Sequence, residues 1–247
     1  MQFRLLGPVG LWLAGDEVEL GPARQRSVLA ILLLSHDQPL PTGALIARVW
    51  GEDPPARACH VLYTYVTRLR SVLGRAAAVR LSRRTCGYTV DIEPEVIDVC
   101  RFNRLLASAE QARDAGARIR VLREALALWR GEPLAGLSGD WIDRTRERLR
   151  RQRIGALVTC FDLELRLGQH ARVSHELCDL VARHPTVEPL VGQLMLALYR
   201  CGRQAEALEV FREARRTLVE QQGLEPGQAL RQLERSILSD DRALQLS

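Results

Sequence analysis

Residues 56–90 read ARACHVLYTYVTRLRSVLGRAAAVRLSRRTCGYTV, a helical pattern followed by a hairpin pattern. The spacing predicts a helix from about Ala56 to Leu73, and residues 81–90 predict two strands around a basic tip. Apolar residues of the helix recur at the spacing of a stripe that faces a core: Leu62, Val66, Leu69 and Leu73. A helix of this kind followed by a basic hairpin forms the second half of a winged helix-turn-helix.

The opposite face of the expected helix is polar and carries no acidic residue: it shows His60, Thr64, Thr67, Arg68 and Ser71. Its groups suit base edges and phosphates, and we include His60 in the predicted DNA-binding set. Seven arginines and no acid lie between Asp53 and Asp91: Arg57, Arg68, Arg70, Arg75, Arg80, Arg83 and Arg84. A GC-rich genome explains why all 35 basic residues are arginine, but not this local excess in a chain of net charge +5. The excess predicts a polyanionic partner.

The third helix of a winged helix-turn-helix lies in the major groove of DNA. We expect Arg68 to read base edges, because a guanidinium forms two hydrogen bonds with guanine. Thr64, one turn earlier, and Thr67 are expected to contact bases or phosphates. Tyr65 and Arg70 flank this face and suit phosphate contacts, which position the protein without specifying sequence.

The hairpin is expected to contact DNA as well. Ser82 suits a phosphate, and Arg84 suits the adjacent minor groove, whose negative potential attracts guanidinium groups. Arg83 adds a second charge at the tip. The competing interpretation is a solvated charged surface, but such a surface normally mixes both signs, and residues 54–90 contain no acid.

The residues before the helix supply the rest of the winged helix-turn-helix, which we place at residues 1–93. The first twenty residues alternate between apolar and polar, with turn signals between them, which predicts about three short antiparallel strands. Pro22 opens one helix, and we expect Thr42 to cap a second helix that ends at Trp50. We interpret Trp50 as a core aromatic that holds the second helix against the third, rather than as a phosphate contact.

Residues 96–247 predict an all-α domain in segments of about 12 to 20 residues separated by glycine or proline. A comparison of this part with itself finds a step of 34 residues, the period of tetratricopeptide repeats. The step relates Val173, Leu177 and Leu180 to Ala207, Phe211 and Ala214. The first helix of the repeat lacks the signature residues of tetratricopeptide repeats, so we call the repeat degenerate. The expected fold is therefore an α+β winged helix-turn-helix followed by tetratricopeptide-like helices, mainly α.

Six arginines form a second cluster on one expected helix: Arg144, Arg146, Arg148, Arg150, Arg151 and Arg153. Acidic residues are interleaved with them at Asp140, Asp143 and Glu147, so pairing between residues four apart explains part of the cluster. A supplementary contact with DNA or a partner is the alternative.

Several classes of protein are excluded by what the sequence lacks. The six cysteines form no CxxC pair, so we expect neither disulfides nor zinc. His175 and Cys178 are three residues apart, but a surface histidine and a small cysteine explain them better than a metal site does. No phosphate-binding glycine motif or GxSxG nucleophile is present. We expect no enzyme, no metal and no cofactor.

The sequence predicts a folded protein of the cytoplasm, and the predicted DNA binding would associate it with the nucleoid. Hydrophobic residues make up 47% of the 247 residues and charged residues 26%, which excludes disorder as the main state. No apolar run reaches the ~20 residues of a membrane span, and no signal peptide is visible.

In this arrangement the chain resembles the Streptomyces antibiotic regulatory proteins, activators of secondary-metabolite gene clusters. They join an OmpR-type winged helix to a helical bacterial transcriptional activation domain. The resemblance covers essentially the whole chain. In the first domain it rests on FRLLG (3–7), PARQR (22–26), VWGEDPP (49–55), TYVTRLR (64–70) and CGY (86–88). In the second it rests on WRGEPL (129–134), EPL (188–190), LYRCGRQAEAL (198–208) and GLEPG (223–227).

The resemblance implies double-stranded DNA as a partner, bound at direct heptameric repeats upstream of promoters by two protomers in tandem. It also implies recruitment of RNA polymerase holoenzyme through the sigma factor and the C-terminal domain of the polymerase α chain. At the matched positions Arg68 and Thr64 look like base readers, Thr67, Arg70 and Ser82 like phosphate contacts, and Arg84 like the wing arginine. A glycine commonly precedes the Gly-Tyr pair in this family, whereas this wing tip is stiffer and more basic.

A second hypothesis is a helical-repeat adaptor whose N-terminal fold binds a protein rather than DNA. It leaves the acid-free interval of residues 54–90 unexplained. The two hypotheses differ in salt dependence, because each phosphate contact contributes about −0.9 to the slope of log affinity against log salt. The sequence leaves open the operator, the regulated cluster, any ligand, and whether this is the N-terminal part of a larger regulator.

Overall fold

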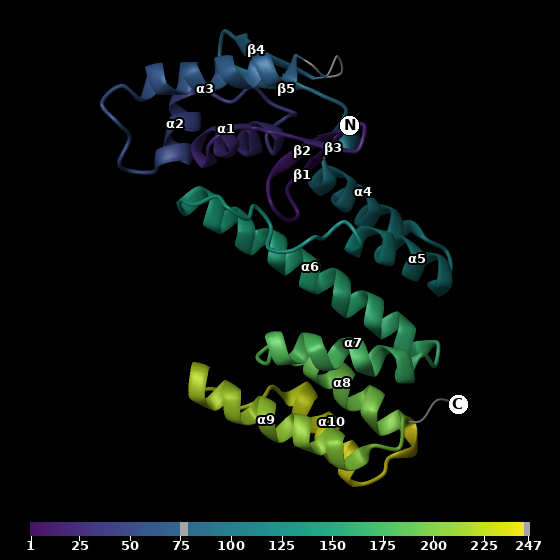
Figure 1. Ribbon diagram of the computed structural model, residues 1–247. Helices are drawn as coiled ribbons and strands as arrows, with labels where there is room; N and C mark the ends of the chain where they lie inside the picture. The colour runs from purple at the N-terminus through teal and green to yellow at the C-terminus, as the bar shows by residue number, and fades with distance from the viewer. Residues whose placement is uncertain (75–78, 245–247) are drawn as a thin grey trace. The chain divides into compact units, whose positions relative to one another are not determined.

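The computed structural model describes residues 1–74 and 79–244 (Figure 1). Arg75, one of the seven arginines of the acid-free interval, lies outside the described residues. The chain forms two compact units, Met1–Ile154 and Gly155–Ser247, and the boundary between these ranges falls within the long helix α6 (Asp140–Arg166). Each unit is described by itself.

The first unit begins with the expected antiparallel sheet, formed by β1 (Gln2–Arg4), β2 (Gly10–Leu13) and β3 (Asp16–Val18) in that order. Phe3 of β1 lies opposite Leu11 of β2, and both side chains are fully buried. The alternation of apolar and polar residues thus gives the sheet one face in the core.

Three helices follow, α1 (Ala23–Leu33), α2 (Thr42–Trp50) and α3 (Ala58–Leu73). Pro22 precedes the first of them, as expected. The predicted cap of α2 by Thr42 is wrong: Pro41 occupies the N-cap position, and no side chain caps the helix. Proline is tolerated there because the first backbone N–H groups of a helix lack intrahelical partners.

The apolar stripe of α3 faces the core, as its spacing predicted. Leu62, Val66, Leu69 and Leu73 are all at most 1% exposed. The helix packs against α1, α2 and the following strand. This packing leaves the polar face of α3 toward solvent.

The wing is a hairpin of β4 (Arg80–Arg84) and β5 (Gly87–Asp91), joined by residues 85 and 86. One of its faces carries Leu81, Tyr88 and Val90, all of which are buried. Together with the helices, the hairpin completes the winged helix-turn-helix.

After the wing come a short 3-10 helix, η1 (Pro94–Val96), and the helices α4 (Asp98–Gln111) and α5 (Ala115–Leu126). The carboxylate of Asp98 accepts hydrogen bonds from the backbone N–H groups of Leu5, at 2.8 Å, and Leu6, at 3.1 Å. The start of α4 is therefore tied to the chain just after β1.

The segment between α5 and α6 also bonds to the chain just after β1. Leu6 accepts a hydrogen bond from the N–H of Arg130, and Leu5 from that of Leu134, both at 2.8 Å. These contacts explain why the first compact unit extends to Ile154, past the expected division into 1–93 and 96–247. That division into a winged-helix domain and a transcriptional activation domain stays a prediction.

The second unit consists of the end of α6 and of α7 (His170–Arg183), α8 (Glu188–Arg200), α9 (Gln204–Gln222) and α10 (Gln228–Leu238), with a 3-10 turn at Arg242–Leu244. Consecutive helices pack as antiparallel pairs, α7 on α8 and α8 on α9. No helix in the described part of the chain is long and apolar enough to cross a membrane.

The 34-residue step recurs in the backbone of the turns. Gly168 and Gly202 both have left-handed φ angles, 75° and 76°. The residue after each glycine donates to the carbonyl five positions earlier: Gln169 to Glu164 at 3.0 Å and Arg203 to Leu198 at 2.9 Å. This is the Schellman closure of a helix, which glycine permits without strain. The two turns therefore start equivalent helices, α7 and α9, in tetratricopeptide-like pairs.

Candidate nucleic-acid interface

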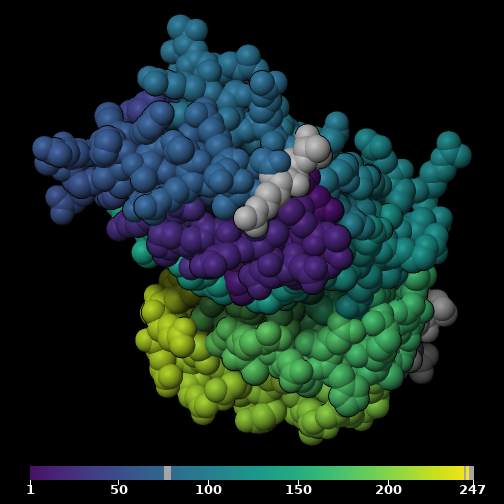
Figure 2. Space-filling view, turned by 45° about the horizontal axis from the view of Figure 1, so that its top comes forward, coloured from purple at the N-terminus to yellow at the C-terminus, as the bar shows by residue number. Residues whose placement is uncertain are grey.

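The exposed face of α3 carries the predicted DNA-binding residues of the helix. His60, Thr67 and Arg68 are exposed, whereas Thr64 is half-buried. Figure 2 shows α3 and the wing, in blue, as one continuous surface. Neither α3 nor β4 contains an acidic residue, so a phosphate approaching this surface from the helix side meets no carboxylate of these two elements.

The two threonines of this face bond to the helix backbone. The hydroxyl of Thr64 donates to the carbonyl of His60 at 3.1 Å, and that of Thr67 donates to the carbonyl of Tyr63 at 2.9 Å. Each oxygen keeps lone pairs that can accept a further hydrogen bond. To donate to a phosphate, either hydroxyl must leave its backbone partner, at the cost of one local hydrogen bond.

Arg70 has a structural contact that the sequence did not indicate. Its Nε donates to the carbonyl of Leu81 at 2.9 Å, which links α3 to β4. The residue is half-buried, and the two terminal nitrogens of a guanidinium are further donors that suit a phosphate. The residue thus holds the wing against the helix.

Tyr65 packs on Trp50, at the end of α2. The ring centroids are 6.4 Å apart and the planes 13° from parallel, an offset stack between half-buried rings. Trp50 therefore joins the second helix to the third, in line with its interpretation as a packing residue. The stack also fixes the ring of Tyr65 beside the exposed face.

The wing presents its predicted residues on two faces. Residues 80, 82 and 84 share one face, because side chains alternate along a strand, and Arg83 points to the other. Asp91, on the opposite strand, lies on the face of Ser82 and Arg84. Its carboxylate is 3.6 Å from the guanidinium of Arg84 and accepts a bond from the Ser82 hydroxyl at 3.4 Å.

Gly87 positions the wing against the helices. Tyr88 and Leu40 exchange two backbone hydrogen bonds, at 2.8 and 2.9 Å, just before α2. Gly87 has a φ of 143°, and a Cβ built there would lie 2.0 Å from the carbonyl oxygen of Leu40. Only glycine allows this approach, so the Gly-Tyr pair sets where the basic tip lies.

Two residues of this surface were missed by sequence reasoning. Tyr63 is 53% exposed on α3, one turn before Thr67, and its phenol suits a phosphate. Tyr63 lies four residues before Thr67, and residues four apart share one side of a helix, so this spacing was the signal in the sequence. Asp91 was treated only as the end of the acid-free interval, because its pairing with Ser82 and Arg84 follows from a strand register that the sequence does not state.

The second arginine cluster is partly structural. Arg146 donates to the carbonyls of Pro133, Leu134 and Leu137 at 3.0 to 3.2 Å and so fastens the segment before α6. The hydrogen bond of Arg150 with Glu132 raises the pKa of that guanidinium. Arg144 and Arg148 are exposed, and their contact with DNA or a partner stays a prediction.

Two of the thiols have raised pKa values, and no metal-binding cluster in residues 1–74 and 79–244 includes them. These residues hold no group of three or more His, Cys, Asp or Glu side chains placed to bind a metal. Burial raises the pKa of Cys100 to about 11, which keeps the thiol protonated. Burial likewise raises the pKa of Cys178, the neighbour of His175 on α7.

The fold and this surface define a winged-helix regulator joined to a helical-repeat module, and the comparisons agree. Residues 15–99 match the family model described as "Transcriptional regulatory protein, C terminal". Residues 97–238 match the "Bacterial transcriptional activator domain". The chain belongs to the Streptomyces antibiotic regulatory protein family of transcriptional activators, a family of regulators and not of enzymes.

Relatives are similar along nearly the whole chain. The regulatory protein AfsR of Streptomyces griseus is 40% identical over 247 residues, which cover 99% of this chain and 25% of AfsR. The regulatory protein DnrI of Streptomyces peucetius is 38% identical, covering 98% of this chain and 93% of DnrI. This chain thus spans about a quarter of the length of the AfsR proteins.

A solved structure has the same fold. Mycobacterium tuberculosis EmbR, in complex with a low-affinity phosphopeptide, matches with a TM-score of 0.88 at 32% sequence identity. The match covers 97% of this chain and 65% of that one.

Proposed function

We propose that this chain is a sequence-specific DNA-binding activator that binds direct repeats upstream of promoters and recruits RNA polymerase. The gene cluster that it would serve is one for a secondary metabolite, such as an antibiotic. The observation that carries the proposal is the acid-free, exposed face of α3 beside a basic wing, in a module that matches a transcriptional regulatory family. Such a surface is complementary to the phosphate backbone of DNA.

Each contact has an expected role. Arg68, with Thr64 beside it, reads base edges in the major groove. His60, Tyr65, Thr67 and Arg70 contact the helix-side phosphates, and Tyr63 joins them. Ser82 contacts a phosphate from the wing, and Arg83 and Arg84 approach the minor groove.

The proposed partners extend beyond one stretch of DNA. A second protomer binds the next repeat in tandem, and the holoenzyme is contacted through the sigma factor and the C-terminal domain of the polymerase α chain. A regulator of this kind acts in the cytoplasm, at the nucleoid. Support comes from the match to the bacterial transcriptional activator domain and from similarity to DnrI and AfsR.

A salt series separates DNA binding from the adaptor hypothesis. Affinity for a random-sequence duplex is measured by fluorescence anisotropy at several salt concentrations. We expect log affinity to fall with log salt, with a slope of about −0.9 for each phosphate contact. A flat response would contradict the proposal and favour a protein partner for the winged helix.

Recruitment is tested by transcription in vitro. Purified RNA polymerase holoenzyme is supplied with a promoter that carries the selected repeats at its upstream edge. Added protein is expected to raise transcript yield from this promoter and not from one with scrambled repeats. Equal yields from both would contradict the recruitment claim while leaving DNA binding intact.

A further inference from the structure

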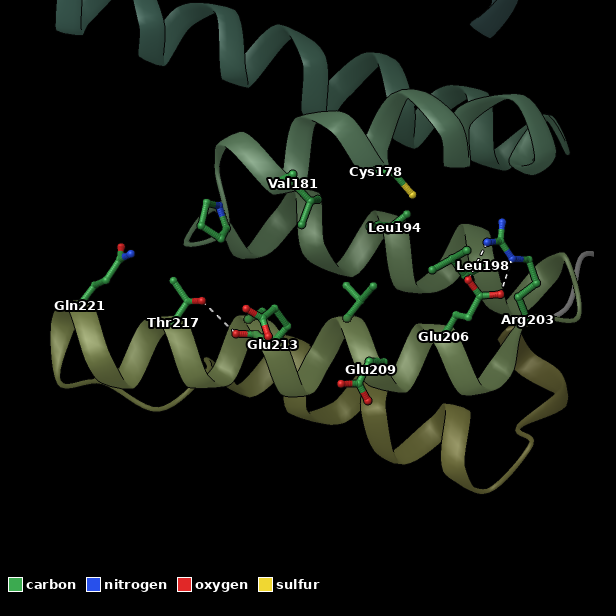
Figure 3. Close-up of a pocket in the computed structure, with 14 residues that line it drawn as sticks. Cys178, Val181, Leu194, Leu198, Arg203, Glu206, Glu209, Glu213, Thr217 and Gln221 are labelled. Atoms are coloured by element: carbon green, nitrogen blue, oxygen red, sulfur yellow. Dashed lines mark hydrogen bonds and ion pairs between the residues drawn. The ribbon is translucent and has the colours of Figure 1, made fainter.

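The second unit contains a groove that DNA recognition does not use. It runs along α9 and is closed on its other sides by α7 and α8, with a volume of about 690 Å³ (Figure 3). All of its lining residues fall between Cys178 and Gln221, within the second compact unit.

The floor of the groove is apolar. Leu194 and Leu198 of α8 lie at the bottom, each 2% exposed, and Val181 and Ala182 of α7 form one side. Val210 of α9 adds to the other side. Side chains of this kind hold a partner by removing its apolar residues from water.

The wall that α9 contributes is acidic. Glu206, Glu209 and Glu213 all line the groove and are exposed, and their spacing of three and four places them on one side of the helix. Arg203 is the only basic residue of the described lining, and it pairs with Glu206 at 2.6 and 2.7 Å.

The other two acids are paired with arginines of α9 rather than across the groove. Glu209 pairs with Arg212 and Glu213 with Arg216, and neither arginine belongs to the described lining. Exposed pairs of this kind are weak, so both carboxylates are free to exchange partners.

The shape of the groove suits a helix. From Glu206 to Gln221 the α9 wall is sixteen residues long, and the fifteen steps between them span about 22 Å at the rise of an α-helix. A bound helix of about four turns would match it. Nucleic acid does not fit, because its phosphates would face the glutamates.

We propose that this groove binds a basic amphipathic helix of a protein partner. Apolar residues of that helix, recurring every three or four positions, pack on Leu194, Leu198 and Val210. Arginine or lysine residues along its flank pair with Glu209 and Glu213. This is a helix-in-groove mode of recognition, made specific by charge. It does not depend on DNA binding by the winged helix.

The test selects peptides from a random library of about sixteen residues displayed on phage, with the purified chain as bait. We expect enriched sequences to carry leucine or isoleucine at every third or fourth position, with arginine or lysine along one flank of the helix. Their binding as synthetic peptides is then measured by anisotropy, and the gain in helix by circular dichroism.

Variants locate the binding site. The double charge reversal Glu209→Arg/Glu213→Arg is expected to weaken the selected peptides by about tenfold or more at low salt, because like charges then face each other. Ala182→Trp fills the groove from the exposed end of α7 and should weaken them equally. Glu220→Arg, an exposed acid of α9 outside the groove, is the matched control and should change nothing. Thermal unfolding checks that each variant is folded.

Three results would overturn the proposal. One is a selection with no enriched family, and another is enrichment of acidic or uncharged peptides. The third is binding of basic peptides that both groove variants leave unchanged, since those peptides bind elsewhere. Enriched sequences that copy residues 144–153 of this chain, with dimers in ultracentrifugation, would instead assign the groove to a second copy and contradict a separate partner.

Discussion

Arg68 and Arg70 lie two residues apart on α3 but have different surroundings. Arg68 is exposed at the centre of the polar face. Arg70 is half-buried and donates to the Leu81 carbonyl, so it has a structural role that does not need a ligand. Substitutions at the two positions should therefore give different patterns of loss.

Replacing Arg68 by alanine tests the base-reading role. We expect a loss of about 1–3 kcal/mol at the selected operator and relaxed base preference at one position. Affinities for the operator and for duplexes with each base at that position are measured by anisotropy. Arg113→Ala, at an exposed arginine of the same unit, controls for net charge. Unchanged base preference would mean that α3 is oriented differently in the groove.

Replacing Arg70 by alanine should have two effects. All DNA sequences should bind more weakly alike, with a salt slope about one unit shallower. The lost bond to Leu81 should also lower the free energy of unfolding, by about 0.5–1.5 kcal/mol. Salt-dependent anisotropy and urea titration measure the two. A loss confined to one DNA sequence would contradict a phosphate contact.

We expect Asp91 to oppose DNA binding at the wing, because its carboxylate contacts Ser82 and Arg84. Asp91→Asn keeps the shape and removes the charge. Affinity should rise about two- to fivefold at low salt for every sequence, since exposed ion pairs are worth up to about 1 kcal/mol. Glu110→Gln, at an exposed acid of α4, is the control for net charge. Weaker binding by Asp91→Asn would mean that the pair holds the wing in its binding shape.

At the scale of elements, one close backbone contact joins the wing to the segment before α2. Gly87 allows β5 to pair with Leu40, and the hairpin tip is carried from there. The helices do not need this contact for their own core, which is formed by the stripe of α3 against α1 and α2.

Gly87→Ala is therefore expected to detach the wing. The added methyl group would collide with the Leu40 carbonyl at 2.0 Å, in a backbone conformation that alanine rarely adopts. Strain of this kind costs about 1–3 kcal/mol or more. Unfolding by urea measures the loss, and hydrogen exchange at residues 80–91 should rise first. Full stability would show that the wing docks in another way.

Local periodicity predicted the elements that depend on it. The stripe of α3 and the 34-residue step were visible because both repeat along the chain, and both are found. The Thr42 cap was not predicted correctly. A threonine beside a proline indicates where a helix begins, but not which of the two residues occupies the N-cap position.

Contacts between distant residues could not be predicted in the same way. The bond from Arg70 to Leu81 and the pairing of Asp91 depend on how a helix and a hairpin pack. The groove of the second unit needs three helices in place before its acids and its leucines share a surface. The sequence carries these residues, but their proximity is set by tertiary structure.

At the scale of the whole molecule, each compact unit has its own core, and we propose a separate partner surface on each. In the first, Asp98 ties α4 to the chain after β1 and is almost fully buried. Burial raises the pKa of this carboxyl to about 6, although the hydrogen bonds from Leu6 and Leu5 oppose the shift.

This shift makes the stability of the first unit depend on pH. The folded protein holds the Asp98 proton more tightly than the unfolded chain, whose aspartates titrate near 4. Stability from this group is therefore greatest at low pH and falls as pH rises through 6. Between pH 5 and pH 7 the change is about 1 kcal/mol. Urea titrations of the wild type and of Asp98→Asn should differ by this pH-dependent amount. A difference that is constant with pH would contradict the shift.

The most direct test of the central claim is selection of binding sites from random duplex DNA by the purified chain. We predict one enriched motif in direct repeat, spaced near one helical turn, about 10 base pairs. Its affinity should fall steeply with salt. Random sequences after selection, together with a flat salt response, would contradict the claim that α3 and the wing read DNA.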